Sequence, residues 1–212
     1  MIIFKVIAPV AQLDRALDYG SRGCRFESYR VYLNIMKLHT INNNIIINVI
    51  GFYICWWLTI FGAISKIYWI GPIATIIFII LHLYKVTNHR KEDIFLLMSF
   101  FIGMFIETFL LNFKIIIHHG ILAKYSLAPL WTVSLWVCFA STLLHSFKWL
   151  SKQYIISSLL GTLSAPLIYF SMHSLGVVSF GIDKIYVAIF TSILWGLFIP
   201  LFIFISDKIL EL

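Results

Sequence analysis

The chain has 212 residues, of which 61% are hydrophobic and only 12% are charged, and its formal net charge is +7. Soluble domains carry about a quarter charged residues, so this composition excludes an ordinary soluble protein. A chain of 212 residues holds about six membrane-spanning helices of roughly 20 residues with short connections, and it leaves no room for a second folded domain.

The first 35 residues differ from the rest of the chain. Ala11–Ala16 can be encoded by the D-arm of a transfer-RNA gene, and Arg25–Ser28 can be encoded by the T-arm in the same reading frame. The apolar start of the chain is interrupted by a lysine and has no small-residue cleavage site, so it makes a poor signal peptide. A basic nucleic-acid-binding arm is the alternative. We predict that residues 1–35 are a spurious or disordered extension, that the protein starts at Met36, and that 36–212 form one transmembrane domain.

Six long apolar runs follow. They are Asn44–Ser65, Tyr68–Lys85, Ile94–Asn112, Ala128–Phe147, Tyr154–His173 and Tyr186–Ser206. Runs of this length without an alternating polar period predict helices, because a helix satisfies its backbone hydrogen bonds within one segment. The predicted fold class is all-α, a polytopic membrane bundle of about six transmembrane helices.

The fifth run carries small residues at four-residue spacing. Ser157, Gly161 and Ala165 would lie on one helix face, which predicts close packing against a neighbouring helix. Pro166 and Pro200 fall inside the fifth and sixth runs, where we expect them to bend the helices.

The positions of Lys and Arg predict the orientation, because cytoplasmic loops carry an excess of these residues. With the N-terminus inside, the cytoplasmic set is Lys37, Lys85, Arg90, Lys91, Lys148, Lys152 and Lys208, and the outer set is Lys66, Lys114, Lys124 and Lys184. We therefore predict a multi-pass protein of the bacterial inner membrane with both termini cytoplasmic. The segment Phe113–Leu127 is too short and too polar to cross, and we expect it on the outer face, with a re-entrant hairpin as the alternative.

Glu107 is the acidic residue that lies well inside a predicted span. A carboxylate at that depth is costly, so we expect it to face the bundle interior and to be paired or protonated. Counting helical rise, it lies about 20 Å from the inner end of its span, level with the hydroxyls of Tyr169, Thr132 and Ser134. These four residues are the candidate polar intramembrane site, which is either a proton or substrate site or a structural hydrogen bond.

Histidines are the other candidate ligands. His82 and His145 fall near the cytoplasmic ends of the second and fourth spans, but two histidines without a third ligand are a weak metal signal. His118, His119 and His173 could gather outside, but adjacent histidines on an irregular loop would point apart. We therefore predict neither a metal nor a cofactor.

The cysteines suggest nothing further. Cys24, Cys55 and Cys138 form no CxxC or Cys/His ligand spacing, and the last two lie in spans, where they would act as small apolar residues. No hydrolase, nucleotide-binding or zinc-protease motif is present in the sequence either.

The fourth and fifth runs resemble a known family. The matching residues are Ala128–Trp131, Leu135–Trp136, Phe139–Leu143, His145–Ser146 and Trp149–Leu150, followed by Gly161, Pro166–Leu167, Tyr169 and Leu175–Gly176. This pattern resembles the domain-of-unknown-function family 2878, uncharacterised bacterial inner-membrane proteins, and the likeness covers 36–206. The resemblance implies a small multi-span protein without an established activity, and it slightly favours a lipid-linked role.

Two function classes remain open. The favoured one is a non-catalytic membrane component or lipid-pathway accessory, whose partners are the lipid bilayer and possible membrane or lipid-pathway proteins. The alternative is a small transporter or intramembrane enzyme with a polar site around Glu107. A water-accessible cavity at Glu107 would discriminate between these two classes. We expect no nucleic-acid partner, because no basic cluster with interleaved aromatic residues occurs outside the spans.

Overall fold

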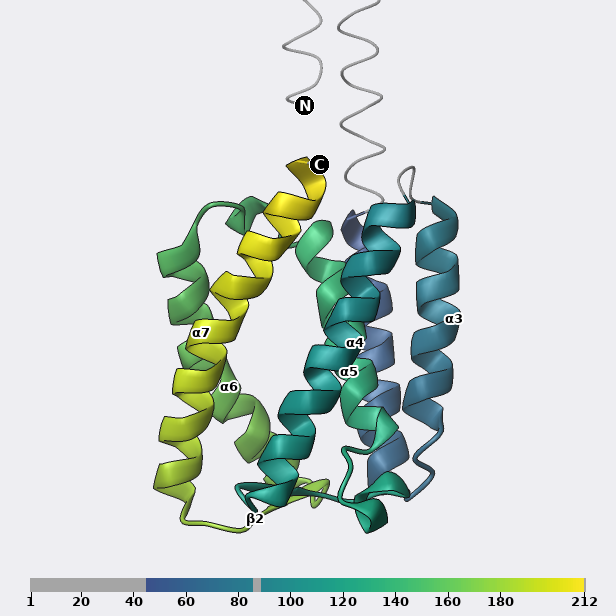
Figure 1. The fold of residues 1–212 in the computed structure, drawn as a ribbon. Coiled ribbons are helices and arrows are strands. Elements are labelled where there is room, and N and C mark those ends of the chain that lie inside the picture. The colour runs from purple at the N-terminus through teal and green to yellow at the C-terminus, as the bar shows by residue number, and fades with distance from the viewer. Residues whose placement is uncertain (1–44, 86–88, 212) are drawn as a thin grey trace, which may run out of the picture. The chain divides into compact units, whose positions relative to one another are not determined.

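The computed structural model describes residues 45–85 and 89–211, which form helices and one small sheet (Figure 1). The predictions for residues 1–35 and for a start at Met36 lie outside the described residues. Residues 46–212 form one compact unit.

The helices follow the predicted apolar runs. The described helices are Ile45–Ile64, α3 (Ile70–Lys85), α4 (His89–Asn112), α5 (Leu130–Leu144), α6 (Tyr154–Ser174) and α7 (Lys184–Glu211). Short 3₁₀ turns, η1 (Leu122–Tyr125) and η2 (Lys148–Leu150), precede α5 and α6. The prediction of an all-α fold is confirmed.

Within the described part of the chain, four helices are long and apolar enough to cross a membrane. Their membrane-compatible stretches are Ile45–Ile64, Lys91–Asn112, Tyr154–Ser174 and Lys184–Ile209. Helices α3 and α5 are apolar but have only 16 and 15 residues, fewer than the roughly 17 to 25 that usually span a bilayer. That these two also cross the membrane stays a prediction.

The outer surface of the bundle is apolar. Ile155 on α6 is 79% exposed, Phe105 on α4 is 72% exposed and Leu197 on α7 is 68% exposed, while Glu107 is only 4% exposed. Helices that expose large apolar side chains and bury carboxylates are expected where the surrounding solvent is hydrocarbon.

The helices run alternately up and down, as side-chain contacts between their ends show. Asn48 in the first turn of Ile45–Ile64 donates to the carbonyl of Ser141 near the end of α5. The backbone N–H of Lys152, just before α6, donates to Asp207 in the last turns of α7. The beginning of the first described helix and the end of the last one therefore lie at the same end of the bundle.

The small residues of α6 pack against α7, as predicted. Ser157, Gly161 and Ala165 are all buried. A Cβ atom added at Gly161 would lie 2.4 Å from the carbonyl oxygen of Trp195, so the two backbones approach too closely for a side chain. Prolines lie within α6 and α7, and both helices continue through them.

A two-stranded antiparallel sheet lies at the other end of the bundle (Figure 1). In sequence, one strand lies between α4 and α5 and the other between α6 and α7. Strand β1 (Ile116–His118) pairs with β2 (Val178–Phe180), and His118 is opposite Val178. We call this end of the bundle the sheet end. The expected irregular outer segment therefore contains a strand.

Candidate functional site

An interior cavity of about 320 Å³ lies among the helices. Its walls are mainly aromatic and aliphatic, and its polar lining includes Glu107, His118, Thr132 and Tyr169. Small-molecule pockets typically measure about 300 to 1,000 Å³ and combine apolar walls with a few converging polar groups. The volume of this cavity is at the small end of that range, and its lining likewise combines apolar walls with a few polar side chains.

Glu107 lies near the sheet end of α4 and is held by two side-chain donors. The indole N–H of Trp136 on α5 donates to its Oε1 at 2.8 Å, and the hydroxyl of Tyr169 on α6 donates to the same oxygen at 3.1 Å. The carboxylate is therefore directed into the bundle and contacts a hydroxyl of α6. These donors offset the desolvation cost of burying it.

Local sequence explains how Trp136 reaches Glu107. Gly103 precedes Glu107 by one helical turn, and a Cβ atom placed there would lie 2.5 Å from Cγ of Trp136. The missing side chain lets the indole lie directly against α4. Its other side stacks on Trp195 of α7, with ring centroids 4.6 Å apart and planes inclined by 24°.

His118 approaches the second oxygen of Glu107. Its Nε2 lies 2.8 Å from Oε2, and its side chain is completely buried. The angles at this contact are not those of a good hydrogen bond, so we describe it as a close charged contact that becomes an ion pair when the imidazole is protonated. Sequence reasoning placed His118 on an irregular outer loop and missed this contact.

Strand geometry explains why the two adjacent histidines separate. Successive side chains on a strand point to opposite faces. His118 points inward to Glu107, whereas His119 is exposed and its ring lies 3.3 Å from the hydroxyl of Ser179. The expectation that adjacent histidines point apart holds, but one of them points into the bundle.

Four buried polar atoms of the cavity lining have no hydrogen-bond partner among the described residues. Oε2 of Glu107 and Nε2 of His118 face each other in the charged contact, and the other two are Nδ1 of His118 and the indole nitrogen of Trp195. The Trp195 N–H lies near the hydroxyl of Tyr169 without the geometry of a hydrogen bond. Buried polar atoms are rarely left unsatisfied, so these atoms mark a place where a ligand or water would be stabilised.

The two predicted hydroxyls of α5 do not bind Glu107. Thr132 donates to the carbonyl of Pro129 and Ser134 donates to the carbonyl of Trp131, each within the first turn of α5. Depth alone placed them level with Glu107. Hydroxyls in helices commonly satisfy themselves on the preceding turn, and this local bond is the one observed here. Thr132 still lines the cavity.

Two lining residues also face the outside of the bundle. Tyr53 on the helix Ile45–Ile64 is 57% exposed, and Ile168 on α6 is 36% exposed. The lining of the cavity therefore reaches the apolar outer surface of the bundle at these two residues.

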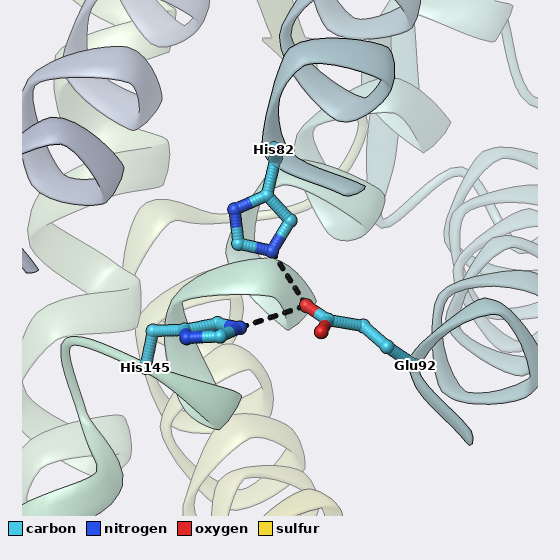
Figure 2. Close-up of side chains that lie close together, drawn as sticks. All are labelled: His82, Glu92 and His145. Atoms are coloured by element: carbon cyan, nitrogen blue, oxygen red, sulfur yellow. Dashed lines mark hydrogen bonds and ion pairs between the residues drawn. The ribbon is translucent and has the colours of Figure 1, made fainter. Parts of the chain in front are cut away.

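A second polar cluster lies at the opposite end of the bundle. His82 near the end of α3 and His145 just after α5 both direct Nε2 at one carboxylate oxygen of Glu92, at 2.5 Å and 2.9 Å (Figure 2). The side chains of Glu92 and His82 are 6% and 8% exposed, and that of His145 is 28% exposed. Sequence reasoning placed the two histidines near the same ends of the second and fourth spans, and in the structure both contact Glu92.

Asn48 supports this cluster from the first described helix. Its Nδ2 lies 3.5 Å from Nδ1 of His82, and its Oδ1 accepts a short hydrogen bond from the hydroxyl of Ser146. The cluster thus joins the ends of four helices. Cys55 and Cys138, by contrast, are buried free thiols further inside the bundle, and no metal-ligand group of three includes them among the described residues.

Glu92 is the member of this cluster that sequence reasoning missed. The third predicted span begins at Ile94 and so leaves out Glu92, which lies in the first turn of α4. The available signal was its spacing from Glu107: fifteen residues place the two carboxylates about 60° apart around a helix, on similar faces, and about 22 Å apart along it.

Comparisons with known proteins reveal a family but no characterised relative. No match was found among curated proteins or among solved structures. A family model described as "Protein of unknown function (DUF2878)" matches residues 45–201, which include the whole cavity lining and all three residues of the second cluster. The resemblance seen in the fourth and fifth runs is thereby confirmed. The chain belongs to the DUF2878 family of proteins of unknown function.

Proposed function

We propose that this protein binds a membrane-dissolved lipid in its interior cavity. The apolar chain of the lipid would occupy the aromatic walls, and its polar group would lie beside Glu107, His118 and Tyr169. The observation that carries the proposal is an apolar cavity of about 320 Å³ that ends at a buried carboxylate and at unpartnered buried nitrogen atoms.

The lining indicates the chemistry of the polar group. Among the described residues no Lys or Arg lines the cavity, and the imidazole of His118 already lies against the carboxylate of Glu107, so a phosphate or carboxylate headgroup would lack a compensating cation. The Trp195 N–H is a donor and requires an acceptor oxygen. A neutral lipid with a hydroxyl or carbonyl group, such as a long-chain alcohol or a diacylglycerol, fits these demands best.

The cavity favours the second of the two predicted function classes. A purely structural carboxylate needs only its protein partners, whereas here the same carboxylate lines a cavity that also contains unpaired polar atoms. We place the protein among lipid-handling membrane proteins, which bind, transfer or modify such a lipid. Whether Glu107 also moves a proton depends on that lipid.

We also propose that the protein is a multi-pass protein of the bacterial inner membrane, with both termini cytoplasmic. The apolar outer surface and the excess of Lys and Arg in the loops at one end support this placement. In that orientation the sheet end is periplasmic, and the cluster of His82, Glu92 and His145 is cytoplasmic.

Photolabelling would test lipid binding. The purified protein in detergent would be irradiated with a long-chain alcohol that carries a diazirine on its chain, and labelled peptides would be mapped by mass spectrometry. We expect labelling of cavity-lining segments of α5, α6 and α7, and we expect competition by unlabelled long-chain alcohol to exceed competition by a fatty acid of equal length.

Two neighbouring substitutions on α6 provide the matched control. Ser164 lines the cavity, whereas the adjacent Leu163 is 67% exposed on the outer face. Ser164→Phe should fill part of the cavity and reduce its labelling, and Leu163→Phe should leave it unchanged. Equal labelling of both variants, or labelling confined to outward-facing residues, would count against a cavity ligand.

A further inference from the structure

We infer that His82, Glu92 and His145 form a binding site for one divalent transition-metal ion. Two imidazoles and a carboxylate offer three ligand atoms that lie within 4.8 Å of one another (Figure 2). Two histidines with one carboxylate are the protein ligands of known zinc and non-haem iron sites, in which the remaining positions are held by water or substrate.

The donor atoms indicate which class of ion fits. Imidazole nitrogen is preferred by zinc, iron, cobalt, nickel and copper, whereas magnesium and calcium prefer sites made of oxygen atoms. With two nitrogens among three ligand atoms, the site selects the first group. No other set of three such ligands lies close together among the described residues.

Binding of an ion requires a small separation of the Glu92 carboxylate from the two imidazoles. At zinc–ligand distances near 2.0 to 2.1 Å, tetrahedral ligand atoms would lie about 3.3 Å apart. The carboxylate oxygen of Glu92 now lies 2.5 Å and 2.9 Å from the two Nε2 atoms. A small outward rotation of the Glu92 side chain would make room for the ion without moving the helices.

Burial and access are also suitable. Glu92 and His82 are almost fully buried, which keeps their side chains in place, while the 28% exposure of the His145 side chain opens one side of the site. An ion could enter on that side, and the same opening leaves a coordination position for water. The three ligands come from α3, from the first turn of α4 and from the residue after α5, so the ion would join three helix ends.

Asn48 is suited to orient His82 toward the ion. A metal-bound histidine usually donates its other ring N–H to an acceptor, which fixes its orientation. As placed, Asn48 presents its amide nitrogen both to Nδ1 of His82 and to the carbonyl of Ser141, and a half-turn of the amide would present Oδ1 to His82 at the cost of the hydrogen bond to Ser141. Ser146 could follow this change because its hydroxyl both donates and accepts.

This inference is independent of the proposed lipid site. Glu92 and Glu107 lie about 22 Å apart along α4, and none of the three ligands lines the cavity. Loss of lipid binding would therefore leave the metal site standing, and loss of metal binding would leave the lipid proposal standing.

Metal titration of the purified full chain would test the site. After treatment with a chelator, the protein in detergent would be titrated with Zn²⁺ against a chromophoric competitor, and with Co²⁺ while visible absorption is recorded. We expect one Zn²⁺ per chain, and a Co²⁺ spectrum of the intensity typical of four or five ligands. Because an ion that binds only the folded state stabilises it, Zn²⁺ should also raise the melting temperature.

Variants identify the ligands. Glu92→Gln, His82→Gln and His145→Gln should each weaken Zn²⁺ binding by at least about 100-fold, and Asn48→Ala should weaken it by about 10- to 100-fold as a positioning residue. Asp93→Asn, in the same turn as Glu92, and His119→Gln, at the sheet end, are exposed controls that should change affinity less than about twofold. His145, the most exposed of the three ligands, is the position at which loss of the ligand should perturb folding least.

Two outcomes would overturn the proposal. The first is a wild-type protein that binds Zn²⁺ no more tightly than Glu92→Gln, which would make the cluster a hydrogen-bonded triad only. The second is binding that the controls reduce as much as the ligand variants do, which would indicate scattered surface sites. In either case the increase in melting temperature caused by Zn²⁺ would be no larger for the wild type than for the variants.

Discussion

Replacement of Glu107 separates its hydrogen-bonding role from its charge. Glu107→Leu keeps a side chain of similar size but removes the acceptor for the Trp136 N–H and the Tyr169 hydroxyl, and it removes the partner of His118. Glu107→Gln keeps one carbonyl oxygen for the two donors and loses the charge. The two variants therefore differ mainly in the number of buried polar groups left without a partner.

The size of the effect follows from those lost contacts. A buried polar group left unpaired costs about 1–3 kcal/mol, and hydrogen bonds inside membrane proteins average about 0.6 kcal/mol because the unfolded chain finds other partners. With two hydrogen bonds and one charged contact removed, we expect Glu107→Leu to lower the free energy of unfolding by about 2–4 kcal/mol. Glu107→Gln should lower it by no more than about 1 kcal/mol.

Unfolding by SDS in mixed micelles, followed by far-ultraviolet circular dichroism, would measure these differences. Phe105→Leu on the same helix is the control, because Phe105 is 72% exposed and its truncation should change little. If Glu107→Leu unfolds at the same SDS fraction as the wild type, the contacts described here do not stabilise the bundle. If Glu107→Gln is as damaging as Glu107→Leu, the charge matters and the hydrogen bonds do not.

Three further predictions concern packing, orientation and the N-terminal segment. Gly161→Ala should destabilise the protein by about 1–2 kcal/mol in the same unfolding assay, because its new methyl group meets the Trp195 carbonyl. At Gly196 the nearest atom is the hydroxyl oxygen of Thr162, which can rotate away, so Gly196→Ala should cost less. Alkaline phosphatase fused between α3 and α4 should be inactive and phosphatase fused near Lys124 active in bacterial cells, and the reverse pattern would invert the orientation. Translation in the native host should yield no tryptic peptide from residues 16–25, and detection of that peptide by mass spectrometry would show that the first 35 residues are made.

Helix positions were predictable because hydropathy is a strong signal in membranes. The run from Tyr154 to His173 differs from α6 by one residue, and the small face at Gly161 packs on α7 as its spacing indicated. The charged first turn of α4 was not predicted. Glu92 and its neighbours lower the local hydropathy, so the predicted run begins only at Ile94. Hydropathy finds the part of a helix that lies in hydrocarbon and omits the turn that extends beyond it.

The contents of the polar site were predictable only in part. Depth along the helices predicted Tyr169 level with Glu107, and the two are hydrogen-bonded, but depth says nothing about rotation around a helix axis. Trp136 was not considered because a tryptophan in a span reads as an apolar residue, although its N–H is a donor. His118 was missed because its contact depends on a three-residue strand, and the pairing of such a strand with residues about sixty positions away leaves no periodic signal.

Because β1 is short, its alignment with β2 depends on which of its side chains face inward. With three residues, the strand has too few backbone bonds to determine its own alignment, so its alignment depends on which side chains it buries. Ile116 and His118 face inward now, and a slip by one residue would turn both of them outward and leave Glu107 without its imidazole. The buried pair of Glu107 and His118 thus helps to specify the alignment of β1. That alignment determines which of the two adjacent histidines points into the bundle.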